Sequence, residues 1–312
     1  MKKFLLQTVV FLVIVIGLII ATILITDQLV KSKADFTLKG APTNIAFGHS
    51  HAAYAFNDTL ISSFANVAAT GESNFYTYLK AKEILEANKQ IKNVFIAFTN
   101  NQIIKATDQT IWGDMYLSNR YYKYSPFMTW GDLSFLAYNN PKGLLGVQNL
   151  AVKKHIEFIG KKENDYIRLN EIGGYIYLIK DSLQYDRRNP STKERMTTYS
   201  DINIQYVEKL IALCKSKNLN VYLYRTPLSD EFNGLFNEDT FLRIAKTRFP
   251  GIDFLDFRKY PVDEHEFGDP EHLNYKGSKK FSVFFDTLLK NGLLNAKNKQ
   301  ELIDQEIAKV GK

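Results

Sequence analysis

This sequence of 312 residues contains a single cysteine, Cys214. One thiol cannot form a disulfide within the chain, so cysteine usage indicates neither an oxidising nor a reducing compartment. Cys214 lies on the apolar side of a helix predicted over residues 204–217, beside Leu210 and Ile211. We therefore interpret it as a small buried hydrophobic residue and not as a nucleophile.

The sequence also lacks a strong excess of charge. Lys and Arg number 40 against 33 Asp and Glu, and the net charge of +7 is spread along the chain. This mild excess suits a solvated surface near anionic lipid or polymer and argues against a nucleic-acid footprint. No Gly-x-Gly-x-x-Gly follows any predicted strand, which argues against a dinucleotide-binding enzyme, and no internal repeat is present.

Charged residues are missing from residues 4–26, a run dominated by Leu, Ile, Val and Phe. At about 1.5 Å rise per residue, a helix over this run is roughly 35 Å long and crosses a hydrocarbon core of about 30 Å with some tilt. A cleavable signal peptide has a shorter apolar region, of roughly 7–15 residues, that ends at a small-x-small site. This run instead closes with Ile25 and Thr26, so we expect a retained transmembrane anchor.

Lys2 and Lys3 precede this run and favour a cytoplasmic N-terminus. Residues 27–42 are polar and predict a short stalk, which leads to a body at residues 43–292 and a polar C-terminal tail at residues 293–312. We expect a single-pass protein of the cell membrane with an extracytoplasmic body, in the periplasm or on the outer surface.

Short apolar runs alternate with amphipathic helical patterns through most of the body. The runs cover residues 44–50, 64–69, 94–98, 220–227 and 252–257, and the helical patterns cover residues 73–89, 204–217, 241–247 and 275–289. This order predicts an α/β fold with a three-layer α/β/α, doubly wound, mostly parallel five-stranded sheet of the flavodoxin-like kind. Ligands bind such sheets beyond the carboxyl ends of the strands.

Residues 105–200 break this rhythm and are rich in aromatic residues, so we expect a helical subdomain inserted between the third and fourth strands. Two interpretations of it stay open. The aromatic side chains could form a helical extension of the core or a cap that lines a substrate site, because aromatic residues serve both purposes.

Two segments at opposite ends of the body have complementary chemistry: Gly-His-Ser-His at residues 48–51, after the first strand, and Asp-Pro-Glu-His-Leu-Asn at residues 269–274, before the last helix. A serine hydroxyl attacks an ester at neutral pH only if an imidazole takes its proton, and an aspartate then orients that imidazole. We expect folding to bring Ser50 to His272, with Asp269 facing His272 across a turn. The alternative is that these residues only cap loops and make buried hydrogen bonds.

These segments resemble the first and last conserved blocks of the SGNH (GDSL-like) hydrolases, and the resemblance covers residues 43–104 and 200–290. It implies an SGNH-like domain in which Ser50, Asp269 and His272 form the catalytic triad.

The resemblance also implies an oxyanion hole made by the backbone N–H of Ser50, a glycine N–H after the second strand and an asparagine side chain after the third. Gly71 matches the glycine. The segment Phe-Thr-Asn-Asn at residues 98–101 approximates the family's Gly-x-Asn-Asp block, and we choose Asn100, with Asn101 as the close alternative.

One residue departs from the family pattern, since His49 stands where Asp or Ser usually precedes the nucleophile. We expect His49 and His51 to make local hydrogen bonds beside the substrate site, as neighbours of the triad together with Asn101. Two histidines without a carboxylate or cysteine set nearby rarely hold a metal, so we expect no metal and no cofactor.

The resemblance implies a serine esterase or an O-acyltransferase, two activities that share one site and that the sequence does not separate. A single N-terminal span before an SGNH-like body is similar to the teichoic-acid D-alanyl transfer protein and to alginate-type O-acetyltransferases. This similarity implies an acylated cell-envelope glycan or polymer as substrate and a membrane-bound O-acyltransferase as partner. The alternative is a catalytically inactive scaffold that binds glycan or an assembly partner, which His49 and the imperfect third block favour.

Overall fold

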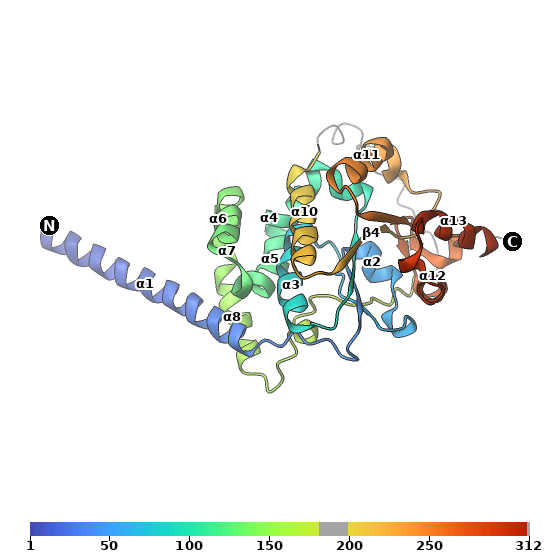
Figure 1. Ribbon diagram of the computed structural model, residues 1–312. Helices are drawn as coiled ribbons and strands as arrows, with labels where there is room; N and C mark the ends of the chain where they lie inside the picture. Colours follow the sequence, from blue (N-terminus) through green and yellow to red (C-terminus); the bar gives the residue numbers. More distant parts are fainter. Residues whose placement is uncertain (181–198, 311–312) are drawn as a thin grey trace. The chain divides into compact units, whose positions relative to one another are not determined.

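The computed structural model describes residues 1–180 and 199–310 (Figure 1). Its contacts divide the chain into two units, one made of residues 1–35 and 112–170 and the other of residues 36–111 and 171–312. The end of the predicted insertion, residues 181–198, and the last two residues of the predicted tail lie outside the described residues.

The second unit contains a five-stranded sheet in which every neighbouring pair of strands is parallel. Its order is β2-β1-β3-β4-β5, and the strands are β1 (Asn44–Phe47), β2 (Phe64–Asn66), β3 (Asn93–Ala97), β4 (Asn220–Arg225) and β5 (Asp253–Asp256). The α/β class and the five parallel strands are confirmed. In this order β2 pairs with one edge of β1 and β3 pairs with the other edge, so the strand order reverses between β1 and β3. The carboxyl ends of β1 and β3 therefore form the topological switch point, where such sheets bind ligands.

Helices cover both faces of this sheet, which explains why its strands are apolar runs without polar alternation (Figure 1). One face carries α3 (Asn74–Ala87) and α10 (Asp201–Ser216), which pack against each other. The other carries α2 (Ser50–Ala55), α12 (Tyr275–Lys290) and α13 (Lys299–Val310). The unit also contains α11 (Glu238–Arg248) and a short antiparallel pair, β6 (Phe267–Asp269) and β7 (His272–Leu273).

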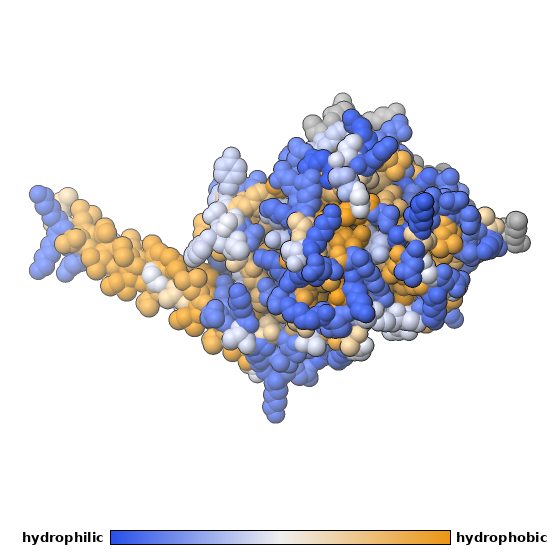
Figure 2. Space-filling view, in the orientation of Figure 1, coloured by the Kyte–Doolittle hydropathy of each residue, from blue (hydrophilic) through white to orange (hydrophobic). Residues whose placement is uncertain are grey.

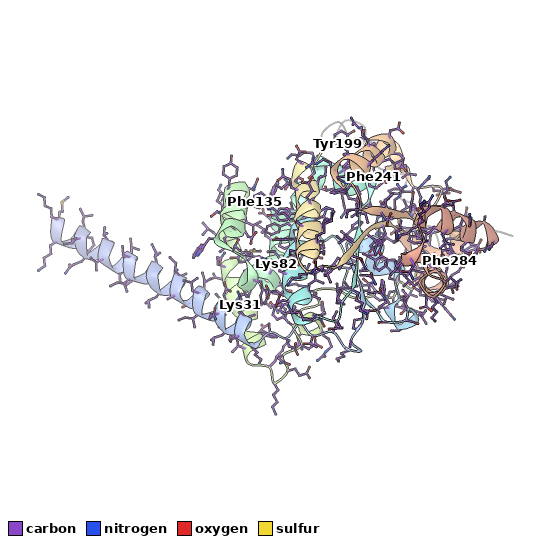
Figure 3. All side chains as sticks on the ribbon, in the orientation of Figure 1. Lys31, Lys82, Phe135, Tyr199, Phe241 and Phe284 are labelled. Atoms are coloured by element: carbon purple, nitrogen blue, oxygen red, sulfur yellow. The ribbon has the colours of Figure 1, made fainter. Side chains whose placement is uncertain are left out.

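Aromatic side chains fill the core between the sheet and α12. Phe56 lies between Phe64, Phe281 and Phe285, with ring centroids 4.8–5.4 Å apart. Beyond β3, Phe98 stacks on Phe241 of α11, which is labelled in Figure 3, at 4.9 Å. Such contacts stabilise each pair by about 0.5–1.5 kcal/mol beyond the area that it buries.

In the first unit, α1 (Lys2–Lys33) is a continuous helix, and it is long and apolar enough to cross a membrane by length and composition. Figure 2 shows the apolar surface along it, with hydrophilic residues at its N-terminal tip. The predicted stalk at residues 27–42 is therefore wrong in its first part, because the helix does not end at Thr26. Tertiary contacts extend it: Val30 is fully buried, Asp27 pairs with His155, and the Lys33 ammonium donates to the carbonyl of Ile159.

The helices α5 (Asp114–Tyr124), α6 (Trp130–Asn139), α7 (Pro141–Gly146), α8 (Gln148–Ile159) and α9 (Tyr166–Leu169) complete this unit. The insertion is thus helical, as predicted, but its helical part is shorter than residues 105–200. Several of its aromatic residues form the unit's own core, since Tyr121, Tyr124 and Tyr166 are buried, whereas Tyr138 is exposed. Residues 171–180 instead belong to the second unit, where Ile176 N–H donates to the carbonyl of Ala53 in α2.

Candidate active site

Ser50 is the first residue of α2, immediately after the carboxyl end of β1. Gly48 makes this tight exit possible, because a Cβ at that position would lie 2.5 Å from the Cβ of Ala97 in β3. The far end of α2 is held by α12, whose Ser278 and Ser282 hydroxyls both donate to the carbonyl of Ala55 at 3.2 Å. The serine is therefore fixed at the switch point of the sheet.

His272 and Asp269 lie opposite each other in the β6–β7 pair, and the two residues between them form its turn. The Nδ1 atom of His272 is 2.8 Å and 2.9 Å from the two carboxylate oxygens of Asp269. Its Nε2 atom is 2.8 Å from the hydroxyl oxygen of Ser50. The structure thus brings together the three predicted residues, although Ser50 is more than 200 positions from the other two in sequence.

Asp269 is ionised in this arrangement. Burial raises the pKa of its carboxyl, but the hydrogen bond and charge of His272 outweigh burial, and the resulting pKa is lower than usual. An ionised carboxylate accepts the Nδ1–H of His272, which assigns the proton to that nitrogen. Nε2 is then the ring nitrogen that faces the Ser50 hydroxyl. This is the arrangement in which an imidazole takes a proton from a serine.

A cavity of about 100 Å³ opens beside Ser50. Its lining includes His49, Gly71 and Asn101, together with Glu72, Ser73, Gln102, Thr107, Thr110 and Asn203. Gly71 has a left-handed backbone, with φ of +60°, in the turn between β2 and α3. Both predicted backbone contributors to an oxyanion hole, Ser50 and Gly71, therefore line one small space.

A fully buried ion pair holds the loop that carries Gly71. The ammonium of Lys80 lies 2.5 Å from the carboxylate of Glu72 and donates to the backbone carbonyls of Val67 and Ile172. These bonds join the end of β2, the start of α3 and residues 171–180. Sequence reasoning missed this lysine, because one lysine within an amphipathic helix is ordinarily solvated.

Asn100 does not face the cavity, so its predicted role as an oxyanion donor is wrong. Its side-chain NH₂ donates to Asn237 at 3.0 Å and to Glu238 at 2.8 Å, and its oxygen accepts from Arg225 at 2.7 Å. With both polar ends engaged and only 1% of its surface exposed, Asn100 has no donor for a substrate. The chain turns at residues 100–103 as a 3₁₀ helix, and the next residue, Asn101, lines the cavity instead.

A short chain of hydrogen bonds fixes the amide of Asn101. Its oxygen accepts from the hydroxyl of Thr99 at 2.6 Å, which leaves the NH₂ end as the donor available to the cavity. The Thr99 hydroxyl is in turn 2.9 Å from Nε2 of His49. Because the threonine proton points to Asn101, the threonine oxygen accepts from His49. The local hydrogen bond expected of His49 is confirmed.

His49 is neutral, because burial lowers the pKa of its imidazole well below the ordinary value and the neighbouring His51 and His272 lower it further. A buried neutral imidazole needs no counter-ion. His49 therefore places no additional charge beside Ser50.

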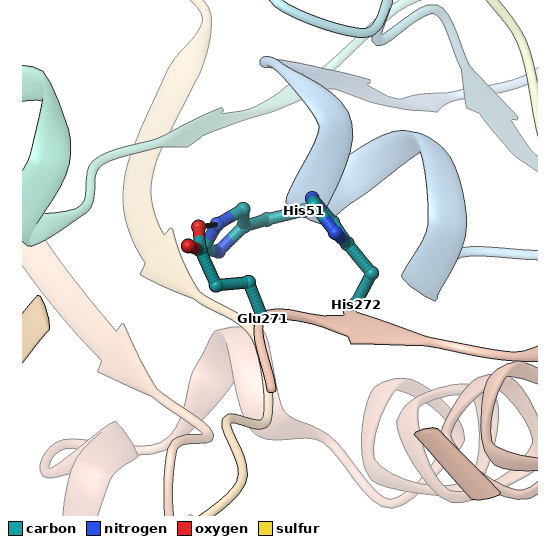
Figure 4. Close-up of side chains that lie close together, drawn as sticks. All are labelled: His51, Glu271 and His272. Atoms are coloured by element: carbon teal, nitrogen blue, oxygen red, sulfur yellow. Dashed lines mark hydrogen bonds and ion pairs between the residues drawn. The ribbon is translucent and has the colours of Figure 1, made fainter. Parts of the chain in front are cut away.

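His51, one position beyond Ser50, is buried and lies 3.1 Å from the carboxylate of Glu271 (Figure 4). Its ring also contacts that of His272, with centroids 5.2 Å apart. Burial lowers the pKa of His51 although the bond to Glu271 opposes this effect. The hydrogen bond expected of His51 is confirmed, but its partner was not foreseen. The only signal for Glu271 was its place between the two triad residues of the 269–274 segment.

Tyr54 is a further residue of the site that the sequence did not single out. It follows Ser50 by one turn of α2, and its ring lies 4.9 Å from that of His272. Burial and the nearby Asp269 charge raise the pKa of its phenol, which therefore stays protonated at neutral pH. The side chain borders His272 as an apolar ring with a hydrogen-bonding tip.

Comparison with known proteins identifies no family of known function for this chain. A family model of unknown function matches residues 180–294, which include Asp269 and His272 but not Ser50. No curated protein matches the chain.

Proposed function

We propose that this chain is a membrane-anchored, extracytoplasmic serine esterase or O-acyltransferase of the SGNH type. The carrying observation is the hydrogen-bonded series from Ser50 through His272 to Asp269, with distances of 2.8–2.9 Å. Asp269 and His272 come from one hairpin, and Ser50 comes from the opposite end of the domain in sequence. Such an alignment beside a cavity supports nucleophilic catalysis over chance loop capping.

The proposed reaction has two halves. His272 takes the proton of Ser50 as its oxygen attacks the ester carbonyl, and the resulting tetrahedral intermediate expels the alcohol, which receives that proton from His272. The acyl group is then bonded to Ser50. In the second half, His272 takes a proton from water or from an acceptor hydroxyl, which attacks the acyl-enzyme and releases Ser50 with its proton restored. Asp269 stabilises the imidazolium in both halves.

The negative oxygen of each intermediate is stabilised in the cavity. The proposed donors are the backbone N–H groups of Ser50 and Gly71 and the side-chain NH₂ of Asn101, all of which belong to residues that line it. The chain of hydrogen bonds from His49 keeps the asparagine donor in one orientation. This arrangement assigns His49 a positioning role.

The size of the cavity favours a short acyl group. At about 100 Å³ it is far smaller than the roughly 300–1,000 Å³ pockets that enclose drug-sized ligands. We propose acetyl-like or alanyl-like esters of a cell-envelope glycan or polymer as substrates, and a membrane-bound O-acyltransferase as the partner in the transferase case. The apolar helix α1 is the proposed link to the membrane.

A serine-reactive fluorophosphonate tests this proposal directly. The full chain, solubilised in detergent, is expected to be labelled, and Ser50→Ala is expected to abolish labelling. Ser216→Ala, at an exposed position of α10, serves as the matched control and should be labelled like the wild type. If folded wild-type protein is not labelled, or if Ser50→Ala is labelled equally, the enzymatic proposal fails and the scaffold alternative gains support.

A further inference from the structure

We propose that His51, Glu271 and His272 form a binding site for a zinc-like divalent cation, and that the bound ion blocks the catalytic histidine. The inhibitory consequence rests on the proposed function, whereas the binding itself does not. No carboxylate stands near His51 in the sequence, so the site exists only because folding brings residues 271 and 272 to α2.

The geometry of the three side chains suits a metal (Figure 4). One ligand atom from each residue lies within 4.8 Å of the other two, and the pair made by His51 Nε2 and Glu271 Oε2 is 3.1 Å apart. Tetrahedral zinc with bonds of 2.0–2.1 Å places neighbouring ligand atoms about 3.3 Å apart. The longest separation must therefore shorten by roughly 1.5 Å at most.

The surroundings of His272 also fit a metal ligand. Zinc-bound histidines almost always donate their second ring N–H to a carboxylate or carbonyl, which fixes the ring and makes the binding nitrogen more basic. Asp269 already accepts the Nδ1–H of His272, so Nε2 is the nitrogen presented. The Ser50 oxygen, 2.8 Å from Nε2, or a water molecule is placed to fill a fourth position.

The donor set and its exposure determine which ions can bind. Two imidazoles and one carboxylate suit zinc, copper or nickel, whereas magnesium prefers oxygen ligands alone. The His51 side chain is 1% exposed and forms the buried side of the proposed metal site. The Glu271 side chain is 41% exposed, so an ion can reach the site from solvent on that side. A metal needs its ligand nitrogen unprotonated, so binding through Nε2 of His51 moves the ring proton to Nδ1, which has no hydrogen-bond partner among the described residues.

Binding and catalysis are mutually exclusive at one atom. The lone pair on His272 Nε2 either takes the proton of Ser50 or coordinates the ion. A bound ion would therefore leave the triad residues in place and prevent serine activation. Zinc availability outside the cytoplasm would then control activity.

Isothermal titration calorimetry of the untagged full chain in detergent tests zinc binding. The same titration is repeated with Ser50→Ala, in which the serine hydroxyl is absent. Zinc is expected to bind once per chain and magnesium not at all. Glu271→Gln, which keeps the size of an exposed side chain, should weaken zinc binding by more than about 10-fold, because loss of a direct ligand exceeds the loss of a supporting residue. Glu264→Gln, on an exposed carboxylate of the same region, should not change it.

Fluorophosphonate labelling of the wild type completes the test, since zinc should slow it and a chelator should restore it. Equal zinc affinity in wild type and Glu271→Gln, both with unchanged melting temperature, overturns the site. Zinc binding without slower labelling overturns the inhibitory role. If the wild type is never labelled but zinc still binds through Glu271, the proposed function fails and the metal site stands.

Discussion

The two neighbouring asparagines Asn100 and Asn101 provide a sharp test of the proposed site, because they have the same side chain and opposite surroundings. Asn101→Ala removes one side-chain amide donor from the lining of the cavity and breaks one hydrogen bond, the bond from the Thr99 hydroxyl. Loss of one oxyanion donor typically lowers kcat by about 10²–10³, or about 2.7–4 kcal/mol of transition-state stabilisation. We expect such a loss with KM nearly unchanged, since the donor acts mainly on the charged intermediate.

Asn100→Ala should have the reverse effect. It breaks three buried hydrogen bonds, to Arg225, Asn237 and Glu238, and two of those partners carry charge. Each buried group left unsatisfied costs about 1–3 kcal/mol, so we expect the free energy of unfolding to fall by about 3–5 kcal/mol. For a domain of this size the melting temperature should fall by roughly 6–15 °C. The kcat of the remaining folded protein should change little.

The assay is hydrolysis of a short-chain chromogenic ester by purified full chain, normalised to the folded fraction, with melting temperature measured in parallel. The reasoning would be refuted if Asn101→Ala kept wild-type kcat. It would equally be refuted if Asn100→Ala lost kcat without losing stability, because the buried network around Arg225 would then not be the role of Asn100.

Three further predictions concern stability. The pKa of His49 in the folded protein lies well below the unfolded value of 6.5, so between these two values only the unfolded chain binds a proton at this imidazole. The free energy of unfolding therefore falls as the pH drops below about 6.5. His49→Asn should make the melting temperature depend less on pH between pH 7.5 and 5, and the same dependence as in the wild type would contradict this. A truncated chain that begins at Thr26 should resist proteolysis within residues 112–170 better than one that begins at Ala34. Burial of the Val30 side chain alone stabilises the folded unit by about 1.5–3 kcal/mol, and the shorter chain lacks it. Equal cleavage rates in the two chains would count against this packing. Lys80→Met should lower the free energy of unfolding, measured by denaturant, by about 3–5 kcal/mol, because it leaves the Glu72 carboxylate buried without its partner. The double variant Lys80→Met/Glu72→Leu should regain much of that free energy. Losses that simply add would contradict the buried ion pair.

The sequence predicts the sheet and the meeting of Ser50, His272 and Asp269 because both depend on local patterns. Buried parallel strands are apolar runs, and the order of runs and helices leaves few topologies. Ser50 could be placed at the end of β1, and Asp269 opposite His272, from spacing alone. Their meeting required only that strand ends gather at one edge of the sheet.

The details that the sequence could not predict depend on distant partners. Whether Asn100 or Asn101 faces the cavity is decided by Arg225 and Glu238, more than 100 residues away. The extension of α1 beyond Thr26 is decided by packing on α8, because four of residues 27–33 are charged or amide residues and the apolar run ends before them. A pattern within a segment contains no information about such contacts.

Asp269 and His272 lie on one late hairpin, while Ser50 lies near the start of the domain. A ribosome completes residue 50 long before residue 272, and β1 can pair with its neighbours β2 and β3 as soon as residue 97 has been synthesised. The Ser50 hydroxyl therefore lacks its bond to His272 until the β6–β7 hairpin has been synthesised and has folded against α2. Under the proposed function, reactivity toward esters would appear only at that late step of folding.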